Sequence, residues 1–520
     1  MSTDWEQRLG VWWIAEDHPD APAIVASPSG PLTYGELTGR AHRIVHTLRA
    51  RGLSDGDGVA VLLGNGVEII ECYLACLEAG WAFTPLNGYL TSAEIATILE
   101  HSGARALVVG SGSAAGYTGV AAETVARLGV VALGVGGVPG LEELDHAVAG
   151  FPTTLPEHRR AGALFPYTSG TTGKPKGIKR AAAAADPSVA ANDAAVFGRA
   201  FDFRPFDGPH LVTTGMYHGG SLAYYSGALQ VGQPLVIHEK FDPERTLADI
   251  ERFAVRTAYM VPTQFHRLLR LPAEVRAKYD VSSLHSVVHS AAPCPQDVKQ
   301  QMMDWWGPVI WETYGGMEGP ATIAKPKWWI KKPGTVGRAI RGVTLSILDP
   351  AGEALAPGEI GSIYIENGIG FEYHGDEAGT TSAFKGSRFT LGDVGYLDED
   401  GYLFIKDREK DMIITGGVNV YPAEVEALLL GHPAVHDVAV IGIPDADWGE
   451  QIKAVVQLKA GLEPTAELGD AILAYCKEHL AAYKCPRTVD FRDDLPRTEA
   501  GKLYKRRIRD EYWAELGRSL

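Results

Sequence analysis

The segment from Tyr167 to Lys179 combines residue types that are suited to holding phosphate: glycines, hydroxyl side chains and lysines. Glycines allow backbone N–H groups to turn toward an anion, hydroxyls donate further hydrogen bonds and lysines supply positive charge. A Walker A loop is excluded, because Pro175 stands where that motif has the Ser or Thr that holds magnesium. A flexible linker of small polar residues is the alternative, and the lysines argue against it. The residues expected to contact phosphate are Thr168, Ser169, Gly170, Thr171, Thr172, Gly173, Lys174 and Lys176.

The strands and helices predicted around this loop indicate an α/β protein. Ala163 to Tyr167 is apolar enough for a short buried strand, so we expect the loop to leave a strand end, where α/β proteins bind ligands. From residue 57 to about residue 320, strand-like apolar runs alternate with helical periods. Asp242-Pro243, for example, offers an N-cap and an N1 proline for a helix that runs through Phe253. The alternation predicts an α/β core with largely parallel sheets.

The pattern changes in the last third of the chain. After about residue 335 it becomes strand-rich, and Asp398-Glu399-Asp400-Gly401 predicts a hairpin turn. The charged run Asp407 to Asp411 then precedes about 110 residues of mixed helix and strand, enough for a small α+β domain. The prediction is therefore an N-terminal domain of residues 1–409 and a C-terminal domain of residues 410–520.

Composition narrows the class of protein. At 520 residues the chain is too long for one core, and 45% hydrophobic with 22% charged residues is ordinary for a globular protein. A net charge of −16 argues against nucleic acid as a partner. No apolar run reaches the ~18 residues that a membrane span needs, and the N-terminus lacks a secretory pattern. The five cysteines form no CxxC pair and fit reduced thiols, so we expect a cytoplasmic protein.

The phosphate loop resembles that of the adenylate-forming superfamily, which includes acyl-CoA synthetases, peptide-synthetase adenylation domains and beetle luciferases. The resemblance extends over essentially the whole chain, with further motifs in the expected order. It implies a large N-terminal domain with a β-rich subdomain and a small, mobile C-terminal domain. It also implies two half-reactions: a carboxylate attacks the α-phosphate of ATP to give acyl-AMP and pyrophosphate, and a nucleophile then takes the acyl group from AMP.

The segment from Glu312 to Glu318 follows a short predicted strand and is similar to the Tyr-Gly-x-Thr-Glu element of the superfamily. A carboxylate opposite a phosphate loop can hold magnesium on the triphosphate. The resemblance implies that Glu318 binds Mg²⁺ and that Tyr314 stacks on adenine, with Glu312 and Thr313 in the same nucleotide site. Met317 replaces the threonine whose hydroxyl contacts the α-phosphate in relatives.

The remaining nucleotide contacts also come from the resemblance. Ser290-Ala291-Ala292-Pro293 looks like the adenine turn of the superfamily, which assigns Ala291, Ala292 and Pro293 to adenine. Asp393 lies between glycines and matches the carboxylate that accepts both ribose hydroxyls. Arg408 matches a basic residue at the same ribose, and Lys410 falls at the interdomain hinge.

Lys502 lies in the segment 496–503, which is similar to the last motif of the superfamily. There a lysine bridges the carboxylate of the acid and the α-phosphate, and its charge is needed because two anions must meet. Lys502 is therefore the expected catalytic residue of adenylation.

The acceptor is expected to be CoA. Gly416 and Gly417, within residues 415–422, resemble the acyl-CoA ligase form of the segment that enters the site for thioester formation. The resemblance assigns Trp448 to pantetheine, and Tyr483, Lys484 and Arg487 to CoA. No carrier domain follows Leu520, so a free acceptor is expected.

The acid pocket is expected to be lined by His218, Gly219, Gly220, Tyr224 and Gly315, with His218 also in the catalytic set. The glycines would leave room for a bulky group, and no basic residue is expected to await a second carboxylate. The runs His289–Pro293 and Trp305–Pro308 resemble bacterial ligases for fatty, steroid-side-chain or terpenoid acids. The prediction is thus ATP-, Mg²⁺- and CoA-dependent ligation of a hydrophobic acid, bulky or polycyclic acids included.

Two alternatives stay open. One is transfer of the acid to a carrier protein instead of free CoA. The other is a variant that performs the thioester step on acyl-AMP with weak or no adenylation, because Met317 replaces the expected threonine and Tyr89 stands where many ligases have arginine. The oligomeric state is open as well, with a homodimer as one candidate.

Overall fold

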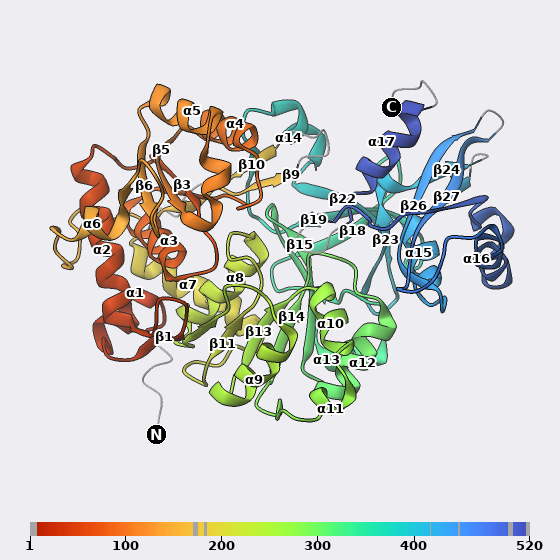
Figure 1. Cartoon of the computed structure of the whole chain (residues 1–520), viewed down its shortest axis with the longest axis horizontal. Coiled ribbons are helices and arrows are strands. Elements are labelled where there is room, and N and C mark those ends of the chain that lie inside the picture. Colours follow the sequence, from red (N-terminus) through yellow and green to blue (C-terminus); the bar gives the residue numbers. More distant parts are fainter. Residues whose placement is uncertain are drawn as a thin grey trace.

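The computed structural model describes residues 8–169, 175–180, 185–415, 418–445, 448–497 and 503–515. Two large sheets with their helices form the main body, and a smaller part with its own sheet lies at one end (Figure 1). This arrangement confirms the predicted α/β class with parallel-rich sheets, a β-rich region and an α+β C-terminal part. No described helix has the length and apolarity that crossing a membrane requires.

The first sheet has six strands, all parallel, in the order β7-β6-β5-β3-β4-β8. Its strands are β3 (Gly58–Leu62), β4 (Ala82–Pro85), β5 (Ala104–Gly110), β6 (Val131–Val135), β7 (Glu142–Glu143) and β8 (Ala163–Leu164). Its helices are α2 (Tyr34–Ala50), α3 (Val67–Ala79), α4 (Ser92–Ser102), α5 (Val120–Leu128) and α6 (Leu144–Val148). Alternate residues of β3 pack into different cores, because helices cover both faces of the sheet.

The second sheet has nine strands in the order β17-β16-β15-β14-β13-β11-β12-β1-β2. They are β1 (Pro22–Ala26), β2 (Leu32–Thr33), β11 (His210–Val212), β12 (Leu235–Ile237), β13 (Thr257–Met260), β14 (Ser286–His289), β15 (Ile310–Gly316), β16 (Gly319–Ala324) and β17 (Arg338–Ala339). The central strands are parallel, whereas β2, β16 and β17 are antiparallel to their neighbours. Its helices are α1 (Val11–Asp17), α7 (Pro187–Ala200), α8 (Gly219–Gln230), α9 (Pro243–Phe253), α10 (Pro262–Leu269), α11 (Ala273–Arg276), α12 (Gln296–Trp306) and α13 (Pro326–Lys331).

Helices on opposite faces of this sheet belong to different cores. Helix α8 shares one continuous core with α2, α3 and one face of each large sheet, while α9, α10 and α12 pack on the other face. The predicted start of α9 is confirmed: Asp242 is the N-cap, accepts a hydrogen bond from the backbone N–H of Arg245, and is followed by Pro243.

The β-rich region is a five-stranded antiparallel sheet beside a three-stranded one, β20-β10-β9. Its strands are β18 (Thr344–Leu348), β19 (Gly361–Glu366), β21 (Phe384–Lys385), β22 (Arg388–Leu397) and β23 (Leu403–Arg408), and the smaller sheet contains β9 (Tyr167–Ser169), β10 (Pro175–Lys179) and β20 (Glu372–Tyr373). Gly401 has a φ of 77° in the predicted turn between β22 and β23, a conformation that glycine adopts without strain.

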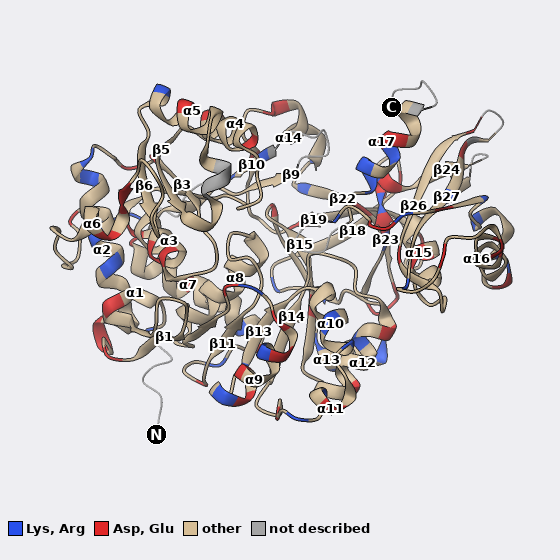
Figure 2. Cartoon of the chain, in the orientation of Figure 1, with Lys and Arg blue, Asp and Glu red and all other residues tan. Residues whose placement is uncertain are grey.

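The C-terminal part has separate hydrophobic cores. Its elements are β24 (Ile413–Thr415), β25 (Val418–Val420), α15 (Pro422–Leu430), β26 (Val435–Asp445), β27 (Gly449–Leu458), α16 (Ala466–His479), β28 (Thr488–Phe491) and α17 (Lys505–Glu515). Acidic and basic residues are spread over both parts of the molecule, and basic residues are prominent on α17 (Figure 2). The domain boundary at residue 409 stays a prediction.

Two local predictions are wrong. Ala163 to Tyr167 is not one strand, because Pro166 lacks the N–H that a ladder needs and separates β8 from β9. The described parts of the phosphate segment, β9 and β10, pair antiparallel with each other. Glu312 to Gly316 do not follow a short strand: they belong to β15, which forms a hairpin with β16.

Candidate active site

A cavity of about 1290 Å³ lies where the two large sheets and the β-rich region meet. Its wall includes β9 and β10, the start of α8, and residues at the carboxyl ends of β11, β13, β14 and β15. Carboxyl ends of parallel strands are the usual ligand-binding edge of such sheets.

Many of the predicted site residues meet in this cavity. Those that line it are Thr168, Lys176, His218, Gly219, Gly220, Tyr224, Ala291, Thr313, Gly315, Met317, Glu318 and Arg408. Described residues that were predicted for the nucleotide and do not line it are Ala292, Pro293, Glu312, Tyr314 and Asp393. The predicted residues Gly170, Thr171, Thr172, Gly173, Lys174, Gly416, Gly417 and Lys502 lie outside the described residues, and Ser169 is described only through its backbone in β9.

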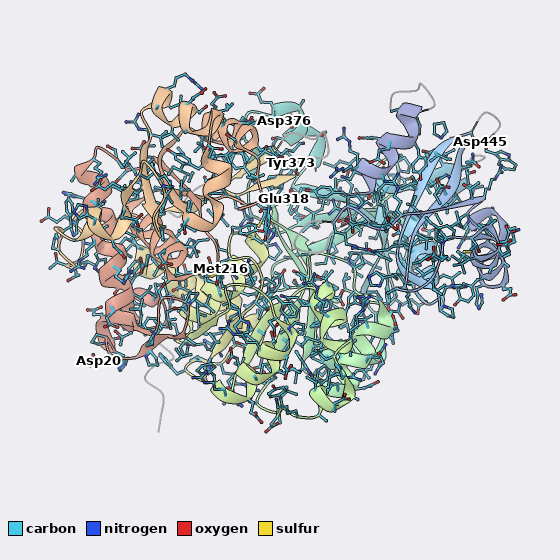
Figure 3. The ribbon with its side chains drawn as sticks, in the orientation of Figure 1. Asp20, Met216, Glu318, Tyr373, Asp376 and Asp445 are labelled. Atoms are coloured by element: carbon cyan, nitrogen blue, oxygen red, sulfur yellow. The ribbon has the colours of Figure 1, made fainter. Side chains whose placement is uncertain are left out.

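Glu318 belongs to a chain of contacts that reaches the phosphate segment. Its Oε1 accepts a hydrogen bond of 2.9 Å from the hydroxyl of Tyr373. The Nζ of Lys176 lies 4.6 Å from the centre of the Tyr373 ring and 3.1 Å from Oδ2 of Asp376. Glu318, Tyr373 and Asp376 follow one another in Figure 3. The pKa of Tyr373 is raised by burial and by the Glu318 carboxylate, so the phenol keeps its proton and donates it.

Tyr373 and Asp376 were missed from the sequence. Tyr373 lies in β20, two residues long, and Asp376 is the N-cap of α14 (Glu377–Ala383). The cap could be recognised locally, because Asp376 accepts a hydrogen bond from the backbone N–H of Gly379. Nothing in the local pattern indicates the contact with Glu318, since Tyr373 reaches it only through the pairing of β20 with β10.

Arg180 is a second residue that the sequence did not single out. It follows β10, lines the cavity and donates a hydrogen bond from Nη2 to the backbone carbonyl of Met317. Burial lowers the pKa of Arg180, and the nearby Glu318 carboxylate raises it. Lys240 and Arg267 line the cavity as well. The expectation that no basic residue of the acid pocket awaits a second carboxylate stays a prediction.

The glycines at the start of α8 do not leave the space that was expected of them. A Cβ on Gly219 would overlap the sulfur of Met317, and a Cβ on Gly220 would overlap the hydroxyl of Tyr259. Both positions are thus filled by other side chains. Met317 lies against the start of α8 and narrows the pocket there.

The open space lies further along α8. Between residues 221 and 230 only Ala223 and Ser226 are not fully buried, and both line the cavity. These two residues form an accessible stripe one helical turn apart, about 4.5 Å along the axis at 1.5 Å per residue. Trp305 and Trp306, whose motif suggested the acid class, lie in α12 and do not line the cavity.

Tyr314 and Asp393 contact each other below the cavity wall. The hydroxyl of Tyr314 donates to Oδ2 of Asp393 at 2.7 Å, and Nε of Arg408 lies 2.7 Å from Oδ1 of Asp393. The ring of Tyr314 is buried in the core of the β-rich region. Tyr314 therefore holds Asp393 in this structure, and its placement does not support stacking on adenine.

Glu312 also lies apart from the cavity. Its Oε2 is 2.6 Å from Nζ of Lys299 and 3.5 Å from Nε2 of His289. Burial by itself raises the pKa of Glu312, but Lys299 and His289 outweigh burial and lower that pKa to about 2. The carboxylate is thus a buried structural partner, and the placement contradicts its expected contact with nucleotide.

The described residues predicted for CoA lie on the C-terminal part in two contacting pairs, Trp448 with Arg487 and Tyr483 with Lys484. The guanidinium of Arg487 lies 4.9 Å from the centre of the half-exposed Trp448 ring and 3.6 Å from Asp445. Lys484 is paired with both oxygens of Glu424 at 2.8 Å, and Tyr483 is half-exposed beside it. The backbone carbonyl of Lys410, the predicted hinge, accepts a hydrogen bond from Arg509 at 3.2 Å. None of these residues lines the cavity.

Comparison with known proteins gives matches that cover nearly all of the chain. A family profile described as "AMP-binding enzyme" matches residues 11–370, and one described as "AMP-binding enzyme C-terminal domain" matches residues 424–502. The chain is 35% identical to feruloyl-CoA synthase of Amycolatopsis sp. over 515 residues, which cover 97% of the chain and 99% of the relative.

Two further matches bear on the acceptor and on the nucleotide. The fatty acid–[acyl-carrier-protein] ligase ScoC of Streptomyces coeruleorubidus is 30% identical over 521 residues, 97% of the chain and 96% of that protein. The crystal structure of ATP-bound MatB from Rhodopseudomonas palustris is similar with a TM-score of 0.85 and 30% identity, covering 97% of the chain and 99% of MatB.

Proposed function

Because the chain belongs to the AMP-binding enzyme family, we propose that it is an AMP-forming acid–thiol ligase that activates a hydrophobic carboxylic acid with ATP and transfers it to CoA. The observation that carries this proposal is the single cavity in which the phosphate-loop hairpin, the Glu318 carboxylate and the accessible stripe of α8 meet. Nucleotide phosphates and an acid would thereby lie in one space, as an acyl transfer through acyl-AMP requires.

The nucleotide end of the cavity suits a magnesium–phosphate complex. Glu318 supplies a carboxylate at this end of the cavity. Mg²⁺ is commonly held by one or two carboxylates together with substrate phosphates. Bound magnesium would neutralise phosphate charge. Tyr373 orients the Glu318 carboxylate by its hydrogen bond, and Lys176 brings positive charge to the same wall. The ammonium of Lys502 would neutralise negative charge where the acid carboxylate approaches the α-phosphate.

The acid would lie along the accessible stripe of α8, with its carboxylate toward Met317. Aromatic rings surround this space: Tyr224 and Tyr259 stack at 4.7 Å between centroids, and Phe197 lies beside Tyr224. The far end carries the hydroxyls of Tyr73 and Ser226. A hydrophobic acid fits the walls, and a ring with a polar substituent, as in the substrate named for feruloyl-CoA synthase, fits the hydroxyls at the end.

The test is a pyrophosphate-release screen over fatty, polycyclic and hydroxylated aromatic acids, with and without CoA. We expect pyrophosphate release with at least one hydrophobic acid and acyl-CoA formation only when CoA is present. Release with no acid in the panel, combined with conversion of supplied acyl-AMP to acyl-CoA, would favour the variant that performs only the thioester step.

A carrier protein is the second candidate acceptor, because the relative ScoC is named for transfer to acyl carrier protein. Comparing free CoA with a pantetheine-loaded carrier protein as acceptor decides between the two. We expect CoA to be the better acceptor, since the guanidinium of Arg487 lies over the half-exposed ring of Trp448 and could contact a free cofactor there.

Ala223→Phe should block the accessible stripe. A phenyl group there would project from α8 into the cavity, and overpacking of this kind costs roughly 1–3 kcal/mol. We expect kcat/KM for the preferred acid to fall about 10- to 100-fold, while a two- or three-carbon acid loses little. Val196→Phe on the outer side of α7, where Val196 is 65% exposed, is the control. An equal loss for long and short acids would contradict the placement of the acid.

Lys410→Pro should slow the thioester step more than adenylation. The proposed C-terminal domain, residues 410–520, must rotate between the steps, because Lys502 and the segment of Gly416 and Gly417 cannot occupy one site together. Proline fixes φ at the hinge, whereas Lys410→Ala removes the side chain and leaves the backbone free. Single-turnover rates of both half-reactions in the two variants are the measurement. Equal losses in both steps would refute the hinge assignment.

A further inference from the structure

We propose that Arg180 binds the α-phosphate of ATP and of the acyl-adenylate, in the place of the hydroxyl that Met317 cannot supply. This inference rests on the proposed function. It adds to the site a residue that belongs to none of the motifs through which the chain resembles its family. The ligand chemistry is a phosphate oxyanion, which Arg binds through paired N–H donors.

The position of Arg180 follows from the strand that carries it. In β10 and just beyond it, Ile178 is buried in the core, Lys179 is exposed to solvent, and Arg180 lines the cavity. β10 belongs to the phosphate segment and pairs antiparallel with β9, so Arg180 directly follows a strand of that segment. Arg180 is thus placed by the same hairpin that presents Thr168 and Lys176.

Arg180 is held beside the residue whose hydroxyl is missing. One of its donors, Nη2, is bonded to the backbone carbonyl of Met317. A guanidinium has five N–H donors, and within the described parts of the chain Nη2 is the one with a hydrogen-bond partner, so further donors can point into the cavity. The hydrogen bond fixes the charge next to residue 317 without using the side chain of Met317, which lies against Gly219.

Among the described residues, no carboxylate oxygen lies within 4.0 Å of a guanidinium nitrogen of Arg180. Glu318 is near enough to raise the pKa of Arg180 and forms no ion pair with it at that distance. A partly buried cation is costly unless an anion compensates it. A phosphate between Arg180 and the metal-binding carboxylate would provide that anion.

Thr313, one neighbouring hydroxyl that could replace the missing one, is already engaged. Thr313 lines the cavity, but its Oγ1 donates to the backbone carbonyl of Thr322 at 2.7 Å. A hydroxyl has one proton to donate. The proton of Thr313 is therefore donated to the backbone of β16, so Thr313 does not supply the missing donor.

The experiment compares Arg180→Gln with Lys179→Gln in the full-length protein. The two variants lose the same charge from adjacent positions, one facing the cavity and one facing solvent. We expect Arg180→Gln to lower kcat/KM for ATP in acyl-AMP formation by about 10- to 100-fold, the scale of a hydrogen bond to a charged group. Lys179→Gln should stay within about twofold. Arg180→Lys, which keeps the charge but not the paired donors, should fall between them.

Met317→Thr supplies the second half of a double-mutant cycle. The threonine hydroxyl should restore much of the lost activity in the Arg180→Gln background and change the wild type much less, because the two groups serve the same phosphate. Additive effects of the two substitutions would overturn the proposal. So would an unchanged kcat/KM for ATP in Arg180→Gln, or a loss confined to dicarboxylic acids, which would assign Arg180 to a second carboxylate of the substrate.

Two readouts separate this inference from its premise. Equilibrium binding of Mg-ATP to wild type and Arg180→Gln does not require turnover, so it tests the phosphate contact even if no acid is found. We expect binding of Mg-ATP to weaken by about 10-fold or more in Arg180→Gln at an unchanged thermal unfolding midpoint. Equal binding by both proteins would refute the role of Arg180, whereas weaker binding without any acyl-AMP formation would refute only the proposed reaction.

Discussion

Lys502→Ala is expected to lower acyl-AMP formation by about 100- to 1000-fold, the cost of removing one group that stabilises developing negative charge. The carboxylate of the acid and the α-phosphate are both anions, so their approach needs a cation between them. Transfer of the acyl group from supplied acyl-AMP to CoA should be nearly unaffected, because the lysine would then have rotated away with its domain. Separate assays of the two half-reactions measure the two effects.

Lys477→Ala is the matched control for this prediction. Lys477 is an exposed lysine of α16 in the same C-terminal part, and removing it takes away the same charge without touching the proposed reaction. Both half-reactions should keep their rates in this control. Adenylation at the normal rate in Lys502→Ala, or an equal loss in both half-reactions, would show that the lysine does not act where the resemblance places it.

Lys299→Met is expected to destabilise the N-terminal part by about 3–5 kcal/mol, because it leaves the buried Glu312 carboxylate without its cation. Lys299 is fully buried, and its ammonium also lies 5.0 Å from the ring centre of Trp329. Urea unfolding followed by tryptophan fluorescence measures the loss. The double variant Lys299→Met with Glu312→Leu should recover most of it, since both charges are then removed together.

The same pair predicts how stability depends on pH. The pKa of Glu312 falls from its ordinary 4.5 to about 2 in the folded protein, so its ionised form stabilises the fold above pH 4.5. That contribution is lost as the pH falls from 4.5 toward 2, where the carboxylate takes up a proton. Glu312→Gln should therefore flatten the acid limb of the unfolding profile. A steep, unchanged acid limb in Glu312→Gln would contradict the role of this pair.

This buried pair also supports the site. His289, the third member, ends β14 directly before Ser290 and Ala291, which line the cavity, and Glu312 lies in β15 directly before Thr313. The charges thus join the two strands whose ends carry the cavity wall. A carboxylate that the motif assigned to nucleotide instead holds the strands in place.

Local sequence patterns predicted most of the framework. The N-cap and proline that begin α9 and the turn at Gly401 lie where the pattern placed them, because each depends on the backbone preferences of neighbouring residues. The order of motifs also indicated the family and the carboxylate Glu318. These features are encoded within a few residues of one another, so they can be recognised without knowing what packs against them.

Contacts between distant segments were decided only by the tertiary structure. The hydrogen bond from Tyr373 to Glu318 joins positions 55 residues apart, and that from Arg180 to Met317 joins positions 137 apart. The filling of the space above Gly219 by Met317 and the pairing of Glu312 with Lys299 likewise depend on which strands and helices become neighbours. The type of a residue determines which hydrogen bonds its side chain can donate or accept. Packing decides which partner it meets, and in this protein that choice turned a predicted nucleotide ligand into a structural anion and brought an arginine outside every motif into the cavity.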